Sequence, residues 1–237
     1  INYDDKHGEI MGANTRAKII SFGLKGNTNI SSKVLENDIS GLTLEINGHE
    51  MTSRLVGRFN AYNLLVAFAV GKYLGQDELS LLTILSSVKA PQGRFEYFLS
   101  DHKITAVIDY AHTPDALENV LKTLLDLKKG TEKLITVFGC GGNRDKGKRP
   151  LMGEIASRLS DQVLITSDNP RNEDPDSIIN EIYHGVPSAL KEKVFTVTDR
   201  MEAIEMACNM ASAGDVILIA GKGHENYQII GNESLHF

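Results

Sequence analysis

The sequence contains little cysteine and no long apolar run. Its two cysteines, Cys140 and Cys208, are far apart and lack metal-ligand spacing, which argues against a disulfide framework and is typical of a reducing compartment. The longest apolar run, Leu64 to Val70, is too short to span a bilayer, and no signal peptide opens the chain. We therefore expect a cytoplasmic protein with no membrane partner.

Basic residues are outnumbered by acidic ones. A formal net charge of −6 argues against a general polyanion binder, so we expect no nucleic-acid partner. The basic cluster from Arg144 to Arg149 must then have a local purpose. With 237 residues, 41% of them hydrophobic, the chain can bury a core and form one or two domains.

Residues 16–56 are rich in β-strand signals, and Asn47-Gly48 is a strong signal for a β-hairpin turn. Residues 89–93 have the composition of a linker. Before this linker we predict strands at 17–22, 42–46 and 51–56, and helices at about 61–74 and 78–88.

After the linker, strands and helices alternate, which predicts an α/β fold with a Rossmann-like, mostly parallel, doubly wound sheet. Residues 227–230 could add an edge hairpin strand. We predict strands near 95–100, 104–109, 133–138, 162–167, 193–198 and 215–220, and helices near 115–128, 150–160, 176–184 and 199–212.

The most informative motif is Asp168-Asn169-Pro170-Arg171, on the loop that leaves the strand at 162–167. Open α/β sheets bind ligands at the carboxyl ends of their strands. The guanidinium of Arg171 suits a carboxylate, while Asp168 and Asn169 can bind an ammonium, so the set fits the zwitterion of an amino acid. The alternative is a plain Asn-Pro turn with a solvated arginine.

Three further loops follow predicted strands and should open on the same sheet edge if the strands are parallel. They begin at Asp109, Gly139 and Gly221. We predict a positive concavity at this edge, formed by Arg144, Lys146, Lys148, Arg171 and Lys222.

Together these motifs resemble the carboxyl-terminal half of the Mur ligase family, in the branch that adds meso-diaminopimelate. The matching blocks occur in the family's order across nearly the whole chain: Asn2 with Asp4-Asp5, residues 57–63, 93–96, 109–117, 138–150, 168–171, 221–225 and Tyr227-Gln228. The resemblance implies that residues 1–90 are the carboxyl-terminal tail of the larger central α/β ATPase domain. Residues 91–237 would be the Rossmann-like amino-acid-binding domain without its final helix.

The family's phosphate loop, magnesium-binding glutamate and carbamylated lysine do not occur in this sequence. Residues 142–149 imitate a phosphate loop but carry Arg149 where serine or threonine should bind magnesium. We therefore expect no catalytic residue and no metal ligand in this chain. ATP and Mg²⁺ would be bound mainly by an upstream part, and the chain alone should not turn over ATP.

The resemblance also implies roles for individual residues, each with a plainer alternative. Asn60 and Asn63 could instead cap a helix, His112 could be a structural loop histidine, and Lys148 and Arg149 could contact phosphate or face solvent. The implied meso-diaminopimelate contacts are Arg144, Asp168, Asn169, Pro170, Arg171, Gly221 and Glu225. The implied nucleotide contacts are Asn60, Asn63, Arg94, Asp109 and His112.

The implied activity is ATP-dependent amide ligation in peptidoglycan synthesis. An acyl phosphate of UDP-N-acetylmuramoyl-L-alanyl-D-glutamate would be attacked by an amine of meso-diaminopimelate. The protein would work in the bacterial cytoplasm, where it serves cell-wall biogenesis, and we expect a monomer. One alternative is a non-catalytic amino-acid-binding fragment. Another is a related ligase that adds lysine or lanthionine to the muramyl dipeptide, or glutamate to folate. The motif at residues 168–171 argues against the lysine and folate ligases. Lanthionine has the same two carboxylates as meso-diaminopimelate, so this alternative stays open.

Overall fold

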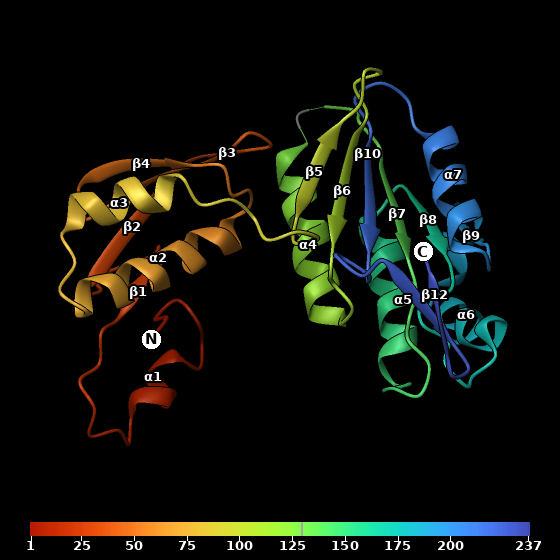
Figure 1. Ribbon diagram of the computed structural model, residues 1–237, viewed down its shortest axis with the longest axis horizontal. Helices are drawn as coiled ribbons and strands as arrows, with labels where there is room; N and C mark the ends of the chain where they lie inside the picture. The colour runs from red at the N-terminus through yellow and green to blue at the C-terminus, as the bar shows by residue number, and fades with distance from the viewer. Residues whose placement is uncertain (129) are drawn as a thin grey trace. The chain divides into compact units, whose positions relative to one another are not determined.

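The computed structural model describes residues 1–128 and 130–237, which divide into two compact units, Ile1–Ala90 and Pro91–Phe237 (Figure 1). Each unit has its own sheet. No helix among the described residues is long and apolar enough to cross a membrane.

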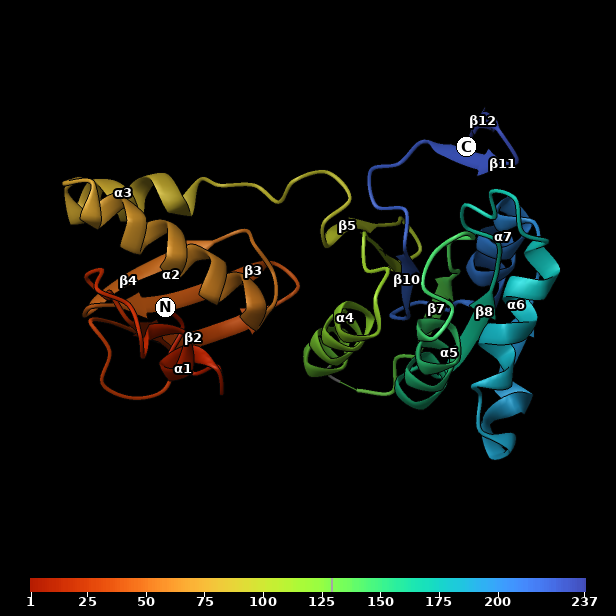
Figure 2. The same ribbon diagram turned by 90° about the horizontal axis from the view of Figure 1, so that it is seen from below.

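The first unit packs two helices on a four-stranded sheet with the order β1-β2-β3-β4 (Figure 2). Only the β1–β2 pair is parallel. Alternate residues of β3, Leu42, Leu44 and Ile46, are fully buried in the core with Phe68 of α2. The elements are α1 (Gly8–Gly12), β1 (Phe22–Gly23), β2 (Ile30–Asp38), β3 (Gly41–Ile46), β4 (His49–Ser53), α2 (Arg58–Tyr73) and α3 (Glu78–Ser86).

The hairpin predicted at Asn47-Gly48 is confirmed. Ile46 pairs with His49, and both turn residues have positive φ, 49° and 85°. Such a two-residue turn matches the twist of the flanking strands, which explains the preference for Asn-Gly. The hairpin places Met51 of β4 opposite Leu44, so both are buried on one face.

The strand predicted at 42–46 is confirmed by β3, but another strand prediction in this unit was wrong and one strand was missed. The strand expected at 17–22 is reduced to Phe22–Gly23, and Ile19 and Ile20 instead line an apolar groove. The long strand β2 was not predicted, because its Ser-Ser-Lys start and Glu-Asn-Asp end lack a continuous apolar alternation. It forms because β1 and β3 pair with its two edges.

The second unit confirms the predicted mostly parallel α/β sheet. Its order is β5-β6-β10-β7-β8-β9, and only the β5–β6 pair is antiparallel. The strands are β5 (Glu96–Leu99), β6 (Thr105–Asp109), β7 (Leu134–Phe138), β8 (Gln162–Ile165), β9 (Val194–Thr196) and β10 (Val216–Ala220). The connecting helices are α4 (Pro114–Leu127), α5 (Lys148–Leu159), α6 (Pro175–His184), η1 (Ser188–Lys193) and α7 (Arg200–Met210).

Helices cover both faces of this sheet. In Figure 2, α4 and α5 lie on one side of the sheet and α7 lies on the other. Ala203 and Ala207 of α7 pack on Ile135, Val137 and Ile217. Because β10 lies between β6 and β7, the loops that follow β6, β10, β7 and β8 leave the same edge side by side.

The segment at 227–230 does form a strand, but it does not extend the main sheet. β11 (Tyr227–Ile230) pairs antiparallel with β12 (Glu233–His236) in a hairpin of its own. This hairpin is attached to the loop after β8, since the Arg171 N–H donates to the Ile229 carbonyl at 3.0 Å and the Gly231 N–H donates to the Arg171 carbonyl at 2.7 Å.

Helices α5 and α6 approach closely through glycines. A Cβ at Gly153 would lie 2.1 Å from the carbonyl oxygen of Ile182, and a Cβ at Gly185 would lie 1.9 Å from that of Pro150. Neither backbone oxygen can move without moving its whole helix end. The glycines therefore set the distance between α5 and α6.

We predict that Gly153→Ala lowers the free energy of unfolding by about 1–3 kcal/mol, because the helices must separate. In an unstrained helix the same change stabilises by about 1 kcal/mol, so the sign of the effect is the test. Urea unfolding measures it, with Arg158→Ala on the exposed side of α5 as the control. A stabilised Gly153→Ala protein would contradict the close packing.

Candidate functional site

A pocket of about 350 Å³ lies at the carboxyl edge of the second unit's sheet. The loops after β6, β7, β8 and β10 all contribute to it, so four segments far apart in sequence form one site. Its walls are Tyr110, His112, Thr113, Gly141, Arg144, Asp145, Lys148, Asp168, Asn169, Arg171, Gly221 and Glu225.

Most residues predicted to contact the amino acid line this pocket. Arg144 and Arg171 face the same space, as does Glu225. Pro170 is the exception: it is buried and lines a neighbouring hollow formed by the ends of β8 and β9 and by the β11 hairpin.

The Arg171 side chain is held by backbone groups and not by a carboxylate. Its Nη1 donates to the carbonyls of Gly142 at 3.0 Å and of Asn169 at 3.3 Å. Its own backbone adopts a positive φ of 52°, which is uncommon for a residue with a side chain. Among residues 1–128 and 130–237, no carboxylate lies within 4 Å of this guanidinium. Its charge is therefore available to a ligand.

Arg144 lies on the glycine-rich loop after β7 and is exposed. It too forms no ion pair with any described residue. The glycines before it allow the two loops to touch: a Cβ at Gly142 would lie 1.9 Å from the carbonyl oxygen of Pro170. The Gly142 N–H donates to the Asn169 carbonyl at 2.8 Å, which joins the loops that carry the two arginines.

Glu225 supplies the opposite charge on the far side of the pocket. It accepts hydrogen bonds from Asn169 Nδ2 at 3.0 Å and from the Tyr110 hydroxyl at 3.3 Å. Its side chain is only 14% exposed. Lys222 Nζ lies 3.8 Å from one carboxylate oxygen, and Glu225 lines the pocket, where it can also accept hydrogen bonds from an ammonium group.

The predicted positive concavity is wrong in part. Lys222 is 3% exposed and does not line the pocket; its Nζ is 3.5 Å from Asp168 Oδ1 and donates to Asn169 Oδ1 at 3.1 Å. Burial lowers the pKa of Lys222. Lys146 pairs with Glu173 outside the pocket, at 3.1 Å. The charged groups in the wall are the cations Arg144, Lys148 and Arg171 and the carboxylates Asp145, Asp168 and Glu225.

Arg149 contacts neither solvent nor an open anion site, so both alternatives for it were wrong. It is fully buried, although it follows directly after the half-buried Lys148. Its guanidinium binds Glu173 through two hydrogen bonds of 3.0 Å and binds Glu181 at 2.8 Å. Burial could not be read from the sequence, because a run of basic residues predicts a solvated surface.

The residues expected near the nucleotide in this unit are engaged locally. Asp109 is 7% exposed, and its oxygens accept the N–H groups of Phe95 at 2.8 Å and Ala111 at 2.7 Å. Burial raises the pKa of Asp109. Arg94 lies over the Tyr110 ring, with its Cζ 4.5 Å from the ring centroid. A ribose contact for Asp109 and a phosphate contact for Arg94 stay predictions.

His112 has the local contact expected of a structural loop histidine, and a nucleotide contact for it stays a prediction. Its Nδ1 lies 2.9 Å from the Tyr110 carbonyl, a local structural contact, yet its exposed ring lines the pocket. Its carbonyl accepts a hydrogen bond of 2.6 Å from Lys148 Nζ. Tyr110 was not predicted as a site residue, although its position at the carboxyl end of β6 was an available signal.

Asn60 and Asn63 belong to the first unit, on α2. They do not cap the helix, because the N-cap residue is Gly57, with a φ of 92°. Asn60 Nδ2 donates to the Val56 carbonyl at 2.8 Å, and Asn63 Nδ2 donates to Asn60 Oδ1 at 3.0 Å. Asn63 remains exposed, and adenine binding by this pair stays a prediction.

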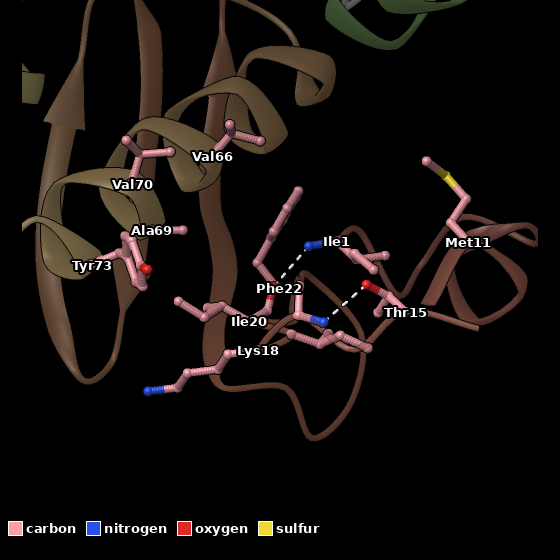
Figure 3. Close-up of a pocket in the computed structure, with 12 residues that line it drawn as sticks. Ile1, Met11, Thr15, Lys18, Ile20, Phe22, Val66, Ala69, Val70 and Tyr73 are labelled. Atoms are coloured by element: carbon pink, nitrogen blue, oxygen red, sulfur yellow. Dashed lines mark hydrogen bonds between the residues drawn. The ribbon is translucent and has the colours of Figure 1, made fainter. Parts of the chain in front are cut away.

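The first unit contains a different kind of hollow, an apolar groove of about 470 Å³ beside α2 (Figure 3). Val66, Val70 and Tyr73 line its α2 side, while Ile20 and Phe22 line the other. The amino group of Ile1 donates to the Ile20 carbonyl at 2.7 Å and is thus already engaged. The groove lacks the paired charges of the pocket in the second unit.

Comparisons with known proteins agree with this arrangement. Residues 93–223 match the family described as Mur ligase, glutamate ligase domain, and residues 1–71 match the Mur ligase middle domain. The chain is 51% identical over 230 residues to a UDP-N-acetylmuramoyl-L-alanyl-D-glutamate–2,6-diaminopimelate ligase of Cytophaga hutchinsonii, covering 97% of this chain and 47% of that protein. A protein of the same name from Bacteroides fragilis is 48% identical, with coverages of 100% and 49%.

A solved structure of a protein with that name is also similar, with 37% sequence identity and a TM-score of 0.66. The match covers 100% of this chain and 50% of that one. The chain therefore spans about half the length of the curated relatives it matches.

We predict that Cys140 is unreactive in the folded protein. Burial raises the pKa of its thiol to about 12, so at pH 8 roughly one molecule in ten thousand carries the thiolate. A thiol reagent should label exposed Cys208 and reach Cys140 only in denaturant, as measured by peptide mass spectrometry. Equal labelling rates in the native protein would contradict the buried position.

We also predict acid-dependent stability from Glu173. The hydrogen bonds from Arg149 and from the Asn143 N–H lower its pKa from 4.5 to about 2. A lowered folded-state pKa stabilises the protein fully above the unfolded value, and this contribution disappears as the pH falls toward 2. The difference in unfolding free energy between wild type and Glu173→Gln should be constant above pH 5 and shrink below about pH 4.5. Parallel curves down to pH 2 would refute the shift.

Proposed function

The chain belongs to the Mur ligase family, and on that premise we propose that it provides the amino-acid pocket of an ATP-dependent ligase. The proposed reaction joins meso-diaminopimelate to UDP-N-acetylmuramoyl-L-alanyl-D-glutamate during peptidoglycan synthesis. We further propose that residues 1–90 are the tail of the central ATP-binding domain and that residues 91–237 bind the amino acid. The protein would act as a monomer in the bacterial cytoplasm.

One observation supports the choice of amino acid more than any other. Two arginines without carboxylate partners share a pocket with Glu225, whose one cationic neighbour among the described residues, Lys222, is buried and does not line the pocket. Glu225 is 3.8 Å from Lys222 Nζ, and Arg144 and Arg171 form no ion pair with any described residue. A ligand with two carboxylates and an ammonium would balance these charges, and meso-diaminopimelate has both.

In this proposal each side chain recognises one ligand group. Arg144 and Arg171 each bind one carboxylate, because the planar guanidinium matches a carboxylate with two parallel hydrogen bonds. Glu225 binds an ammonium, and Asn169 orients Glu225 through its 3.0 Å hydrogen bond. The remaining amine is thereby held in place for attack on an activated acyl group, and this positioning lowers the entropic part of the barrier.

ATP and Mg²⁺ would supply the activated acyl phosphate. The described residues that could approach the nucleotide are Arg94, with an exposed guanidinium, and the exposed ring of His112 in the second unit. Among the described residues, no group of three His, Cys, Asp or Glu side chains is arranged to hold a metal ion. No step proposed for this chain therefore passes through the metal.

Charge alone separates the proposed substrate from lysine. Lysine lacks the second carboxylate, so it would leave one half-buried guanidinium without a partner. Lanthionine has both carboxylates and differs from meso-diaminopimelate by a thioether, so it could pair with the same charged side chains of the pocket. Binding of lysine in preference to meso-diaminopimelate would therefore argue against the proposal, whereas binding of lanthionine would extend it.

We predict that Arg171→Ala weakens binding of meso-diaminopimelate about 30-fold or more, equivalent to about 2 kcal/mol. Calorimetry with the 237-residue chain measures this, with lysine as the second ligand. The affinity ratio of the two ligands should fall toward one in the variant. Arg158→Ala is the control, because Arg158 is an exposed cation of the same unit that does not line the pocket. An unchanged ratio would mean that Arg171 does not bind the distal carboxylate.

A further inference from the structure

The two arginines of the pocket lie on separate loops, so their spacing depends on what joins these loops. Arg144 is on the loop after β7, and Arg171 is on the loop after β8. We propose that the buried ion pair of Arg149 and Glu173 is a positioning pair that sets this spacing. The inference rests on the proposed function, because it concerns the same pocket.

Arg149 reaches both loops from the first turn of α5. Its Nη1 and Nη2 donate to the two oxygens of Glu173, each at 3.0 Å, which makes the contact bidentate. Nη2 also donates to the carbonyl of Gly141 at 3.2 Å. One fixed, planar guanidinium therefore contacts the loop of Arg144 and the loop of Arg171 at the same time.

Glu173 extends this contact toward Arg144. Its Oε1 accepts the N–H of Asn143 at 2.5 Å, and the Asn172 N–H donates to Asn143 Oδ1 at 3.1 Å. Asn143 has a positive φ of 53°, and this residue immediately precedes Arg144. Asparagine adopts the left-handed conformation more readily than most residues with a side chain, and the contacts with Glu173 and Asn172 hold Asn143 in it. Glu173 thus helps to maintain the turn that directs Arg144.

The stability of the fold does not by itself require such a pair. Buried ion pairs often contribute little net stability, because desolvation of the two charges offsets their attraction. This pair is also located between two ligand-binding loops and not in the apolar core of the sheet. A role in positioning accounts for both its burial and its place.

Glu181 provides an internal control. It binds the same Arg149 guanidinium at 2.8 Å, but it belongs to α6, and among the described residues it forms no hydrogen bond or ion pair with either loop. Glu181→Gln and Glu173→Gln each remove one negative charge from Arg149, and only Glu173→Gln weakens the link to Asn143. A purely structural role of the cluster predicts similar effects from the two changes.

The experiment compares meso-diaminopimelate binding and thermal stability in wild type, Glu173→Gln and Glu181→Gln. We expect Glu173→Gln to raise Kd about 10-fold or more, the range for loss of a residue that orients a ligand-binding group, and Glu181→Gln to change it less than about 2-fold. Should Glu173→Gln not fold, Glu173→Asp serves instead, since it keeps the charge but is too short to span Arg149 and Asn143. Equal Kd values in wild type and the Glu173 variant would overturn the proposal.

Hydrogen exchange of the Asn143 and Arg144 amides separates this inference from the proposed function. Faster exchange in Glu173→Gln but not in Glu181→Gln supports positioning of the loop whatever the ligand is. If wild type binds no meso-diaminopimelate while this difference is seen, the substrate assignment fails and the positioning pair stands. Unchanged exchange in both variants would refute the positioning role.

Discussion

The arrangement of the pocket depends on one buried charge, the guanidinium of Arg149. A fully buried cation must be paired and hydrogen-bonded, because leaving it alone in the protein interior costs several kcal/mol. Here the partners come from three separate segments: Gly141 after β7, Glu173 after β8 and Glu181 on α6. The contacts of one guanidinium thus join the loops after β7 and β8 to α6. The close approach of α5 and α6 at Gly153 makes this geometry possible.

The same principle explains which charges remain for a ligand. Another buried cation, Lys222, is bound by Asp168 and Asn169, so it supports two residues of the pocket wall without lining the pocket itself. Arg144 and Arg171 are treated differently: among the described residues their guanidinium groups form no ion pair. The molecule therefore separates cations that hold the loops together from cations that face the pocket. A wall with both signs of charge suits a zwitterion better than a uniformly positive one would.

Sequence patterns predicted the second unit more accurately than the first. Strands such as Leu134–Phe138 are short and almost wholly apolar, and β6, β7, β8 and β9 each precede a helix, so the alternation of strands and helices is clear. In the first unit, β2 is largely polar and exists because two neighbours pair with its backbone. Apolar residues at 19 and 20 looked like part of a strand but line a groove instead. A strand that forms through backbone pairing with its neighbours need not show an alternation of polar and apolar side chains, so the sequence pattern does not predict it.

The sequence by itself determined the parallel α/β sheet and the four polar loops at its carboxyl edge. The Asx-Pro loop after a buried strand was a local signal for Arg171, whereas the resemblance to Mur ligases implied Arg144 and Glu225, and all three line the pocket. Only the tertiary structure decided which basic residues are buried. Lys148 and Arg149 are neighbours in one charged run, yet one lines the pocket and the other is enclosed. The reason is physical: burial of a charge is set by the partners that distant segments place around it, and these partners have no fixed spacing along the chain.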